Sequence, residues 1–142
     1  MIKQLTVFLA NEQGRLSSVC RALADAGINV HALVLADTAE YGVARFLCDR
    51  PEAAARELER RGYRARTVDV LGVYVADRAG GLVEVLDALG ECNVNIEYLY
   101  CISSNTDDAL DILKVDDPRS VEAALKDAGF RIADPSDIYD LD

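Results

Sequence analysis

The sequence lacks a long hydrophobic run and has few basic residues. No stretch approaches the ~20 apolar residues that a membrane-spanning helix needs, and the first residues lack the long apolar centre and cleavage site of a signal peptide. Acidic residues outnumber basic ones by 25 to 15, for a formal net charge of -10. Binders of nucleic acid and of anionic membranes need clustered Lys and Arg. We therefore expect neither partner, and we expect a cytoplasmic protein.

Cysteine and histidine are too few and too scattered to predict a metal site. The four cysteines form no C-x-x-C pair, and His31 is the single histidine. We expect Cys20 and Cys48 to act as small apolar residues in a helix and a strand, whereas Cys101 ends a strand near a loop. The sequence shows no paired carboxylates and no Cys-His constellation. We therefore expect no metal, no cofactor and no catalytic residue, and we do not expect an enzyme.

The chain contains an internal repeat. Residues 10–16, ANEQGRL, resemble residues 76–82, ADRAGGL, at an offset of 66, and the same offset relates residues 28–30 to residues 94–96. Beyond the next loop the match continues at an offset of 67 as far as residues 129–131. An insertion of one residue in that loop explains the change of offset. The sequence is therefore two copies of one unit.

The spacing of apolar residues in each copy predicts the element order strand-helix-strand-strand-helix-strand. Residues 5–9 alternate as in a strand, and the apolar residues of 16–23 recur at i, i+3, i+4 and i+7 as in a helix that ends at Gly27. The further elements of the first copy are a hairpin of residues 28–36 and 41–48, a helix over 51–61 and a strand over 63–71. Those of the second copy are a strand over 73–76, a helix with Leu82, Val85, Leu86 and Leu89 inward, a hairpin of 94–102 and 109–115, a helix capped by Asp117 and opened by Pro118, and a strand over 130–133.

This order is the ferredoxin-like split βαβ plan. The sequence therefore predicts an α+β fold of two ferredoxin-like βαββαβ units, residues 1–71 and 72–142, each with an antiparallel sheet and its helices packed on one face. Only Gly72 separates the last strand of the first unit from the first strand of the second, so we expect the units to pack together. The acidic tail is expected to be a solvated, frayed end; its acids are Asp134, Asp137, Asp140 and Asp142.

The repeated unit resembles the ACT domain, a small regulatory module of amino-acid metabolism, and the chain resembles a tandem pair of them. The resemblance rests on four segments, residues 11–16, 77–82, 27–30 and 93–96. The family's loop usually reads Asn-x-Pro-Gly-x-Leu. Gln13 and Ala79 stand here in place of the proline, whereas the glycines and leucines are kept.

The loop has the chemistry of an anion site. A glycine between strand and helix lets the backbone turn tightly, and the helix then offers unpaired N–H groups and the positive end of its dipole to a carboxylate. In the resembling family, ligands lie between neighbouring units, against this loop and the start of the second strand. The resemblance implies these ligand-binding residues: Asn11, Gln13, Gly14, Arg15, Leu16, Asn29, Val30 and His31 in the first copy, and Asp77, Ala79, Gly80, Gly81, Leu82, Asn95, Ile96 and Glu97 in the second.

The two loops differ, and other roles stay open for some residues. We favour the first loop, because Glu97 would repel a carboxylate and the glycine pair of the second loop is more flexible. Asn11 and Asp77 are alternatively helix caps, His31 is alternatively a packed strand residue, and the second loop alternatively has only a structural role.

The resemblance implies an amino-acid-binding regulatory protein. A free amino acid would be held at the interface of ACT units, and its binding would be signalled through a partner or an oligomer, which we expect to be a homodimer. Two alternatives remain: an obligate regulatory subunit of an enzyme of amino-acid biosynthesis, and an assembly module that binds no ligand. The identity of the amino acid does not follow from the sequence.

Overall fold

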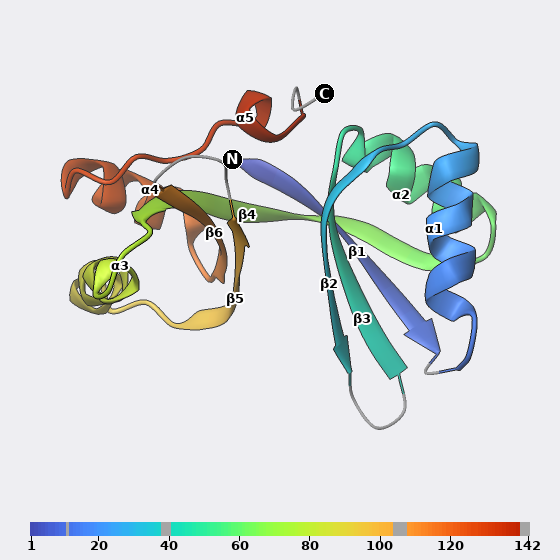
Figure 1. The fold of residues 1–142 in the computed structure, drawn as a ribbon, viewed down its shortest axis with the longest axis horizontal. Helices are drawn as coiled ribbons and strands as arrows, with labels where there is room; N and C mark the ends of the chain where they lie inside the picture. The colour runs from blue at the N-terminus through green and yellow to red at the C-terminus, as the bar shows by residue number, and fades with distance from the viewer. Residues whose placement is uncertain (11, 38–40, 104–107, 140–142) are drawn as a thin grey trace. The chain divides into compact units, whose positions relative to one another are not determined.

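The computed structural model describes residues 1–10, 12–37, 41–103 and 108–139 (Figure 1). Its elements follow the predicted order twice: β1 (Ile2–Ala10), α1 (Arg15–Asp25), β2 (Val30–Asp37), β3 (Tyr41–Cys48), α2 (Pro51–Arg60), β4 (Arg64–Ala76), α3 (Gly81–Glu91), β5 (Ile96–Ser103), β6 (Asp108–Val115), α4 (Pro118–Asp127) and α5 (Pro135–Tyr139). The predicted α+β fold of repeated ferredoxin-like units is confirmed. None of the described helices is long and apolar enough to cross a membrane.

Two compact units divide the chain within β4. The N-terminal unit consists of Lys3–Val68 with the tail from Ser136 onward, and the C-terminal unit consists of Met1–Ile2 with Asp69–Pro135. The domain bounds inferred from the repeat, residues 1–71 and 72–142, remain a prediction.

In the N-terminal unit, the strands are hydrogen-bonded in the order β2-β3-β1-β4. The register of the antiparallel β1–β3 pair places Leu5 opposite Phe46 and Ala10 opposite Tyr41. Helices α1 and α2 lie on one side of these strands (Figure 1). Because successive side chains of a strand point to opposite faces of the sheet, every second side chain points toward the helices, and these are apolar. This core includes Leu5, Val7, Val19, Leu23, Phe46 and Leu58, all of them buried.

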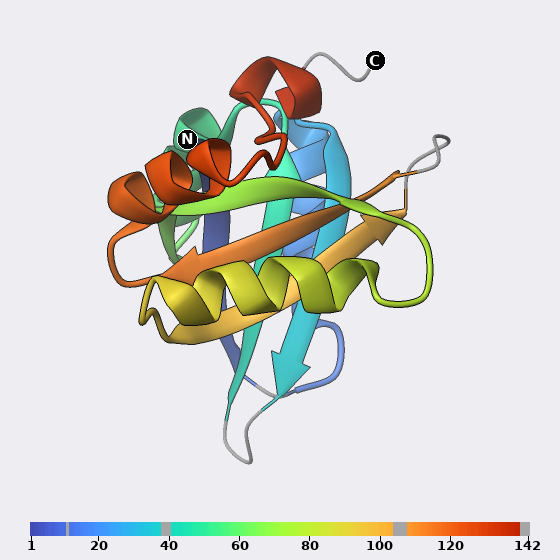
Figure 2. The same cartoon turned by 90° about the vertical axis from the view of Figure 1, so that its left-hand side faces the viewer.

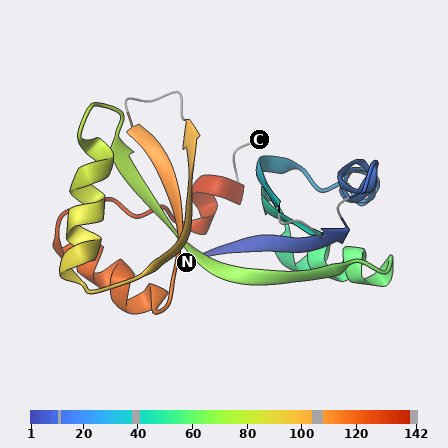
Figure 3. The same ribbon diagram turned by 90° about the horizontal axis from the view of Figure 1, so that it is seen from below.

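In the C-terminal unit, the second half of β4 pairs with β6, and β6 pairs with β5, all antiparallel. Helix α3 runs across these strands (Figure 2), and α3 and α4 lie on the same side of them (Figure 3). The strand predicted at residues 130–133 is wrong as a full strand, because only Ile132 forms an isolated bridge, to Val73. Pro135 follows soon after and has no N–H to donate, so the pairing cannot extend.

Strand β4 is continuous, whereas the sequence predicted two strands separated by Gly72. Gly72 does not turn the chain. A Cβ built on it would lie 2.7 Å from the Ile2 Cδ1 atom and 2.9 Å from the Ala133 Cβ atom. The glycine is therefore explained by close packing within a strand, and the prediction of a break there is wrong.

Two other expectations are also corrected. The acidic tail is not frayed over residues 135–139, because these form α5 and its Ile138 is only 1% exposed; residues 140–142 lie outside the described part of the chain. In α3, Leu82 and Leu86 were expected to point inward, but they are 40% and 37% exposed. The helix instead buries Gly81, Val85 and Leu89.

The ends of the helices agree with their sequence signals. Gly27 has a φ of 71° just after α1, and Asn93, its counterpart in the second copy, has a φ of 55°. Glycine and asparagine are the residues that adopt this left-handed conformation at helix ends. The Asp117 carboxylate accepts a hydrogen bond from the Ser120 N–H group, and Pro118 opens α4. These predicted caps are confirmed.

Candidate functional site

The first strand–helix loop bends at Gly14, as predicted. Gly14 is the N-cap of α1 and has a φ of 83°, a conformation that costs little only for glycine. A Cβ on Gly14 would meet no atom within 4 Å, so the loop borders open space. Among the described residues, no side chain caps this helix end. The Arg15 N–H group donates to the Glu12 carbonyl at 3.4 Å and the Ser18 N–H group to the Gly14 carbonyl at 3.0 Å, so within the described part of the chain the N–H groups of Leu16 and Ser17 are those available to an anion.

A hollow of about 280 Å³ lies beside this bend. It is formed by the end of β1, the loop, the first turn of α1, the end of β2 and the start of β3. Its lining residues are Leu9, Ala10, Glu12, Arg15, Leu16, Leu35, Ala36 and Gly42. Of the predicted binding residues, Arg15 and Leu16 line it, Gln13 is exposed on the adjoining loop, and Asn11 lies outside the described residues.

The hollow has a charged edge and an apolar wall. Arg15 and Glu12 form an ion pair at 3.2 Å between Nη2 and Oε2, and both side chains are at least half exposed. Leu9, Leu16 and Leu35 supply the wall, and Leu35 is 50% exposed. The hollow therefore presents one cation and one anion, paired with each other, beside an apolar surface.

Gly42 keeps this hollow open. A Cβ on Gly42 would lie 3.5 Å from the Leu35 Cδ1 atom and 3.5 Å from the Ala36 carbonyl oxygen, which is ordinary van der Waals contact. Gly42, Leu35 and Ala36 were not predicted from the sequence. Predicting the register of the β2–β3 hairpin would have placed them near the loop. The turn of this hairpin lies at the end of the sheet where β1 also ends.

The start of β2 lies at the opposite end of the same sheet. Val30 pairs with Cys48, whereas the loop follows Ala10, which pairs with Tyr41 at the other end of β3. Within one unit, therefore, Asn29, Val30 and His31 are not brought to the hollow. The residues predicted to bind a ligand therefore do not form a single site within one unit.

The residues at the start of β2 have local contacts of their own. The Asn29 N–H group donates to the Asp49 carboxylate at 3.2 Å, and the Asp49 N–H group donates to the Asn29 carbonyl at 3.2 Å. His31 stands at the irregularity between Val30 and Ala32 and is half-buried. Its Nε2 atom is buried and has no hydrogen-bond partner among the described residues.

The second loop repeats the bend but differs around it. Gly80 has a φ of 86° and is the N-cap of α3. The next residue, Gly81, lies against β4, because a Cβ there would be 2.0 Å from the Ala76 carbonyl oxygen. Arg78 forms an ion pair with Glu84 across the loop. Asp77 does not cap α3, so the alternative role of Asp77 as a helix cap is wrong.

The remaining predicted residues of the second copy are also separated within their unit. Ala79 is in the loop, and Leu82 is exposed on the first turn of α3. The start of β5 pairs with the end of β6, since Ile96 lies opposite Val115, whereas the loop follows Ala76, which lies opposite Asp108. Asn95 and Ile96 therefore lie at the end of the sheet away from the loop, as in the first copy.

Glu97 is at the same end, and its charge has a partner. Lys114 Nζ lies 3.4 Å from Glu97 Oε2. An ion pair of this kind offsets part of the repulsion that Glu97 was expected to exert on a carboxylate. The charge of Glu97 is therefore a weaker reason to favour the first loop than the hollow at Gly14.

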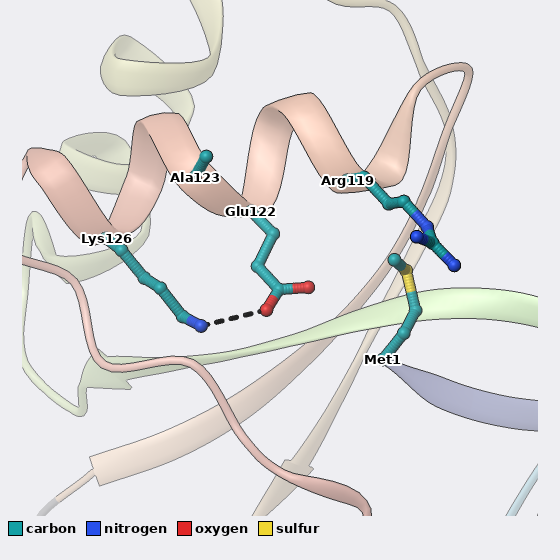
Figure 4. Close-up of a pocket in the computed structure, with 5 residues that line it drawn as sticks. All are labelled: Met1, Arg119, Glu122, Ala123 and Lys126. Carbon is teal, nitrogen blue, oxygen red and sulfur yellow. Dashed lines mark ion pairs between the residues drawn. The ribbon is translucent and has the colours of Figure 1, made fainter.

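A further hollow, of about 390 Å³, lies against α4 in the C-terminal unit (Figure 4). Met1, Arg119, Glu122, Ala123 and Lys126 line it. Glu122 and Lys126 form an ion pair at 3.0 Å within it. None of the binding residues predicted from the sequence is among these lining residues.

The cysteines behave largely as expected. Cys48 is buried, and burial raises the pKa of its thiol to about 12. Cys20 packs against the core of the N-terminal unit, and burial raises its thiol pKa as well. Cys101 is exposed on β5, opposite Asp111, a carboxylate that is only 2% exposed. Partial burial, followed by the hydrogen bond to Asp111 and the charge of Asp111, raises the pKa of the Cys101 thiol to about 11.

We predict that Cys101 reacts slowly despite its exposure and that Asp111→Asn accelerates it several-fold. The thiolate is the reactive form, and with a pKa of about 11 roughly one thiol in a thousand is ionised at pH 8. Removing the Asp111 charge lowers that pKa. Alkylation by iodoacetamide, followed by mass spectrometry, measures the rate, with buried Cys48 as the internal control. An unchanged rate at Cys101 in the variant would contradict the assigned role of Asp111.

Comparisons with known proteins agree with this architecture. A family model of the ACT domain pair matches residues 1–127. The crystal structure of protein BT0572 from Bacteroides thetaiotaomicron is 31% identical, covers 99% of this chain and 96% of that chain, and has a TM-score of 0.92. The ligand-free regulatory subunit of aspartate kinase from Thermus thermophilus is 19% identical over 89% of each chain, with a TM-score of 0.65, and shares the fold. No curated protein matches. The chain belongs to the family of ACT domain pairs.

Proposed function

We propose that the chain binds a free amino acid in the hollow beside Gly14 and thereby regulates a partner protein or a second copy of itself. The observation that carries the proposal is the hollow's combination of a charged edge and an apolar wall. The N-terminal N–H groups of α1 and the Arg15 guanidinium suit the ligand's carboxylate. The Glu12 carboxylate suits its ammonium group.

The size and lining of the hollow support a small aliphatic ligand. Drug-sized molecules occupy sites of about 300–1,000 Å³, and the hollow of about 280 Å³ suits a smaller molecule. Leu9, Leu16 and Leu35 offer apolar contacts but no aromatic ring. Covering the half-exposed Leu35 removes apolar surface from water, which favours binding by roughly 25 cal/mol per Å².

Regulation requires that the ligand prefer one state of the protein. We propose that a unit of a second chain contributes the residues at the start of its second strand to complete the site. In the first repeat these residues are Asn29, Val30 and His31. In the second repeat they are Asn95, Ile96 and Glu97. A ligand held in this way would stabilise one packing of the units, and the expected assembly is a homodimer.

An enzyme of amino-acid metabolism is the alternative partner. The Thermus structure that shares this fold is a regulatory subunit of aspartate kinase, which favours a regulatory subunit as the second candidate function. We propose no catalytic step for this chain, and we expect it in the cytoplasm. Purification of the tagged chain from its own cells distinguishes the candidates, because a stable stoichiometric complex with a biosynthetic enzyme favours the subunit.

A thermal-shift screen against the twenty amino acids tests the proposal. A ligand at 100 times its Kd stabilises a protein by about 2.7 kcal/mol, or roughly 5 to 10 °C in Tm for a chain of this size. Gly42→Val should abolish that rise, because the valine side chain would fill the space between Leu9 and Leu35. Valine is also favoured in strands, so we expect the Tm without ligand to change little.

Two matched variants separate the site from a general effect of charge. Arg15→Gln breaks the ion pair with Glu12 at the hollow. Arg60→Gln breaks the ion pair with Glu57 on α2, in which the two residues are also three positions apart in the sequence. We expect Arg15→Gln to weaken binding several-fold and Arg60→Gln to leave it unchanged. An equal rise in Tm for the wild type and Gly42→Val would mean that the ligand binds elsewhere. A screen with no response at all would favour the assembly module.

A further inference from the structure

Two arginines and a phenylalanine form a cluster on the other face of the N-terminal sheet. Phe8 of β1 alternates with the core residues Val7 and Leu9, and Ala65, between Arg64 and Arg66 of β4, also belongs to the core. Because side chains alternate along a strand, these three residues lie on the face away from α1 and α2. The guanidinium carbons of Arg64 and Arg66 are 5.8 and 5.6 Å from the centroid of the Phe8 ring.

The cluster places two like charges on one ring. Each cation–π contact is worth about 0.5–1 kcal/mol at an exposed site, and both guanidinium groups remain charged at physiological pH. In the described part of the chain, neither Arg64 nor Arg66 forms an ion pair, whereas Arg15, Arg60 and Arg78 each pair with a glutamate. This is unexpected in a chain with 25 acidic residues and 15 basic ones. An anion between the two groups would remove their repulsion.

Two hollows adjoin the cluster and share Phe8 and Arg64. The larger, of about 510 Å³, is lined by Phe8, Glu59, Gly62, Tyr63, Arg64, Ala65 and Arg66. The smaller, of about 420 Å³, is lined by Phe8, Leu9, Ala10 and Arg64. Both volumes lie within the range typical of small-molecule sites, which combine apolar walls with a few polar groups. Glu59 is the one acidic residue in the lining, so the cationic groups outnumber the anionic ones.

We propose that the Phe8–Arg64–Arg66 cluster is a second binding site, which takes a small anion that carries a phosphate group or two carboxylate groups. The planar guanidinium fork matches either group with two parallel hydrogen bonds. The Phe8 ring holds both forks in place, which lowers the entropy lost on binding. Phe8, Arg64 and Arg66 do not line the amino-acid hollow, although the smaller hollow beside the cluster shares Leu9 and Ala10 with it.

Titration of the full-length chain with inorganic phosphate, and separately with succinate, tests the site. Chemical shifts of the Arg64 and Arg66 Nε–H groups are the readout, at constant ionic strength set with chloride. We expect saturable binding of at least one probe in the millimolar range. The probe that saturates identifies the group recognised, phosphate or dicarboxylate. Failure of both probes to saturate would overturn the proposal.

Variants test the role of each part of the cluster by calorimetry with the probe that binds. The double variant Arg64→Gln/Arg66→Gln should weaken binding at least ten-fold, and Phe8→Leu several-fold, because the guanidinium groups lose the ring that orients them. Arg56→Gln, at an exposed arginine of α2 on the helical side of the sheet, is the matched control and should leave affinity unchanged. An equal loss in Arg56→Gln would show only a general attraction of charge and would overturn the site.

The two proposed sites can be tested independently of each other. Arg64→Gln/Arg66→Gln should keep any rise in Tm caused by an amino acid, and Gly42→Val should keep the binding of phosphate or succinate. A chain that binds the anion but no amino acid would contradict the proposed function alone. Loss of anion binding in Gly42→Val would overturn the assignment of the anion to a separate site.

Discussion

Replacing Gly81 with alanine is expected to destabilise the chain by roughly 3 kcal/mol. The added Cβ would lie 2.0 Å from the carbonyl oxygen and 3.1 Å from the carbonyl carbon of Ala76. These are backbone atoms of β4, and Ala76 is paired with Asp108 of β6. Neither partner can move away without disturbing the sheet or the start of α3. The free energy of unfolding, from urea denaturation monitored by circular dichroism, measures the effect.

Gly90→Ala is the matched control, because it makes the same change in the same helix. A Cβ on Gly90 would meet no atom within 4 Å, and Gly90 does not have a positive φ. Alanine has the higher helix propensity, so this variant should be stabilised by about 0.5–1 kcal/mol. If Gly81→Ala were as stable as the wild type, α3 would begin farther from β4 than the structure has it. The explanation that a side chain at position 81 would collide with β4 would then be wrong.

Gly72→Ala is expected to cost roughly 1–3 kcal/mol, the usual range for overpacking a filled core. Its Cβ would lie 2.7 Å from the Ile2 Cδ1 atom and 2.9 Å from the Ala133 Cβ atom. Ile2 is fully buried and Ala133 is 2% exposed, so neither side chain has solvent to move into. Ala133 is also held by the hydrogen bond from its N–H group to the Gly72 carbonyl, at 2.7 Å.

A double-mutant cycle isolates this contact. Ile2→Val deletes the Cδ1 atom that the new methyl group would strike, so the combined variant Ile2→Val/Gly72→Ala should be more stable than the sum of the single effects predicts. We expect a coupling of about 0.5–1.5 kcal/mol. The urea midpoints of the four proteins, compared at equal slope, supply the measurement. Additive effects would place the cost of Gly72→Ala somewhere other than the contact with Ile2.

Glycines in this chain are required for two different physical reasons. The sequence marks Gly14 and Gly80 as bends, and their φ values of 83° and 86° confirm this. Gly72 and Gly81 stand beside similar patterns, yet neither adopts a positive φ. They are needed because another part of the chain comes too close for a side chain. That approach is made by residues far away in sequence, so a local pattern cannot predict it.

The same distinction applies to the apolar stripe of α3. Residues 82–89 have helical spacing, and the helix was predicted correctly, but its buried face was not. Because Gly81 lies against β4, the buried face follows Gly81, Val85 and Leu89, whereas Leu82 and Leu86 remain exposed. Several apolar residues compete to face the core, and the closest approach of the backbone decides between them.

The candidate sites divide in a similar way. The loop at Gly14, with Arg15 and Leu16, could be predicted from the repeat and from the resemblance to the family. Gly42 and Leu35 could not, because they reach the loop only through the register of β2, β3 and β1. The pair of arginines on Phe8 was missed altogether, since residues 8 and 64 are distant along the chain and meet only when β1 and β4 lie in one sheet.

The sequence by itself determined the repeat, the order of helices and strands, the glycine bends before α1 and α3, and the cap of α4. These features depend on periodicity and on short-range backbone preferences, which a few consecutive residues contain. Only the tertiary structure decided that β4 is continuous, that α5 is ordered, which face of α3 is buried, and which residues line each hollow. Those features depend on contacts between distant segments, and their energies arise only when the strands are paired and the core is packed.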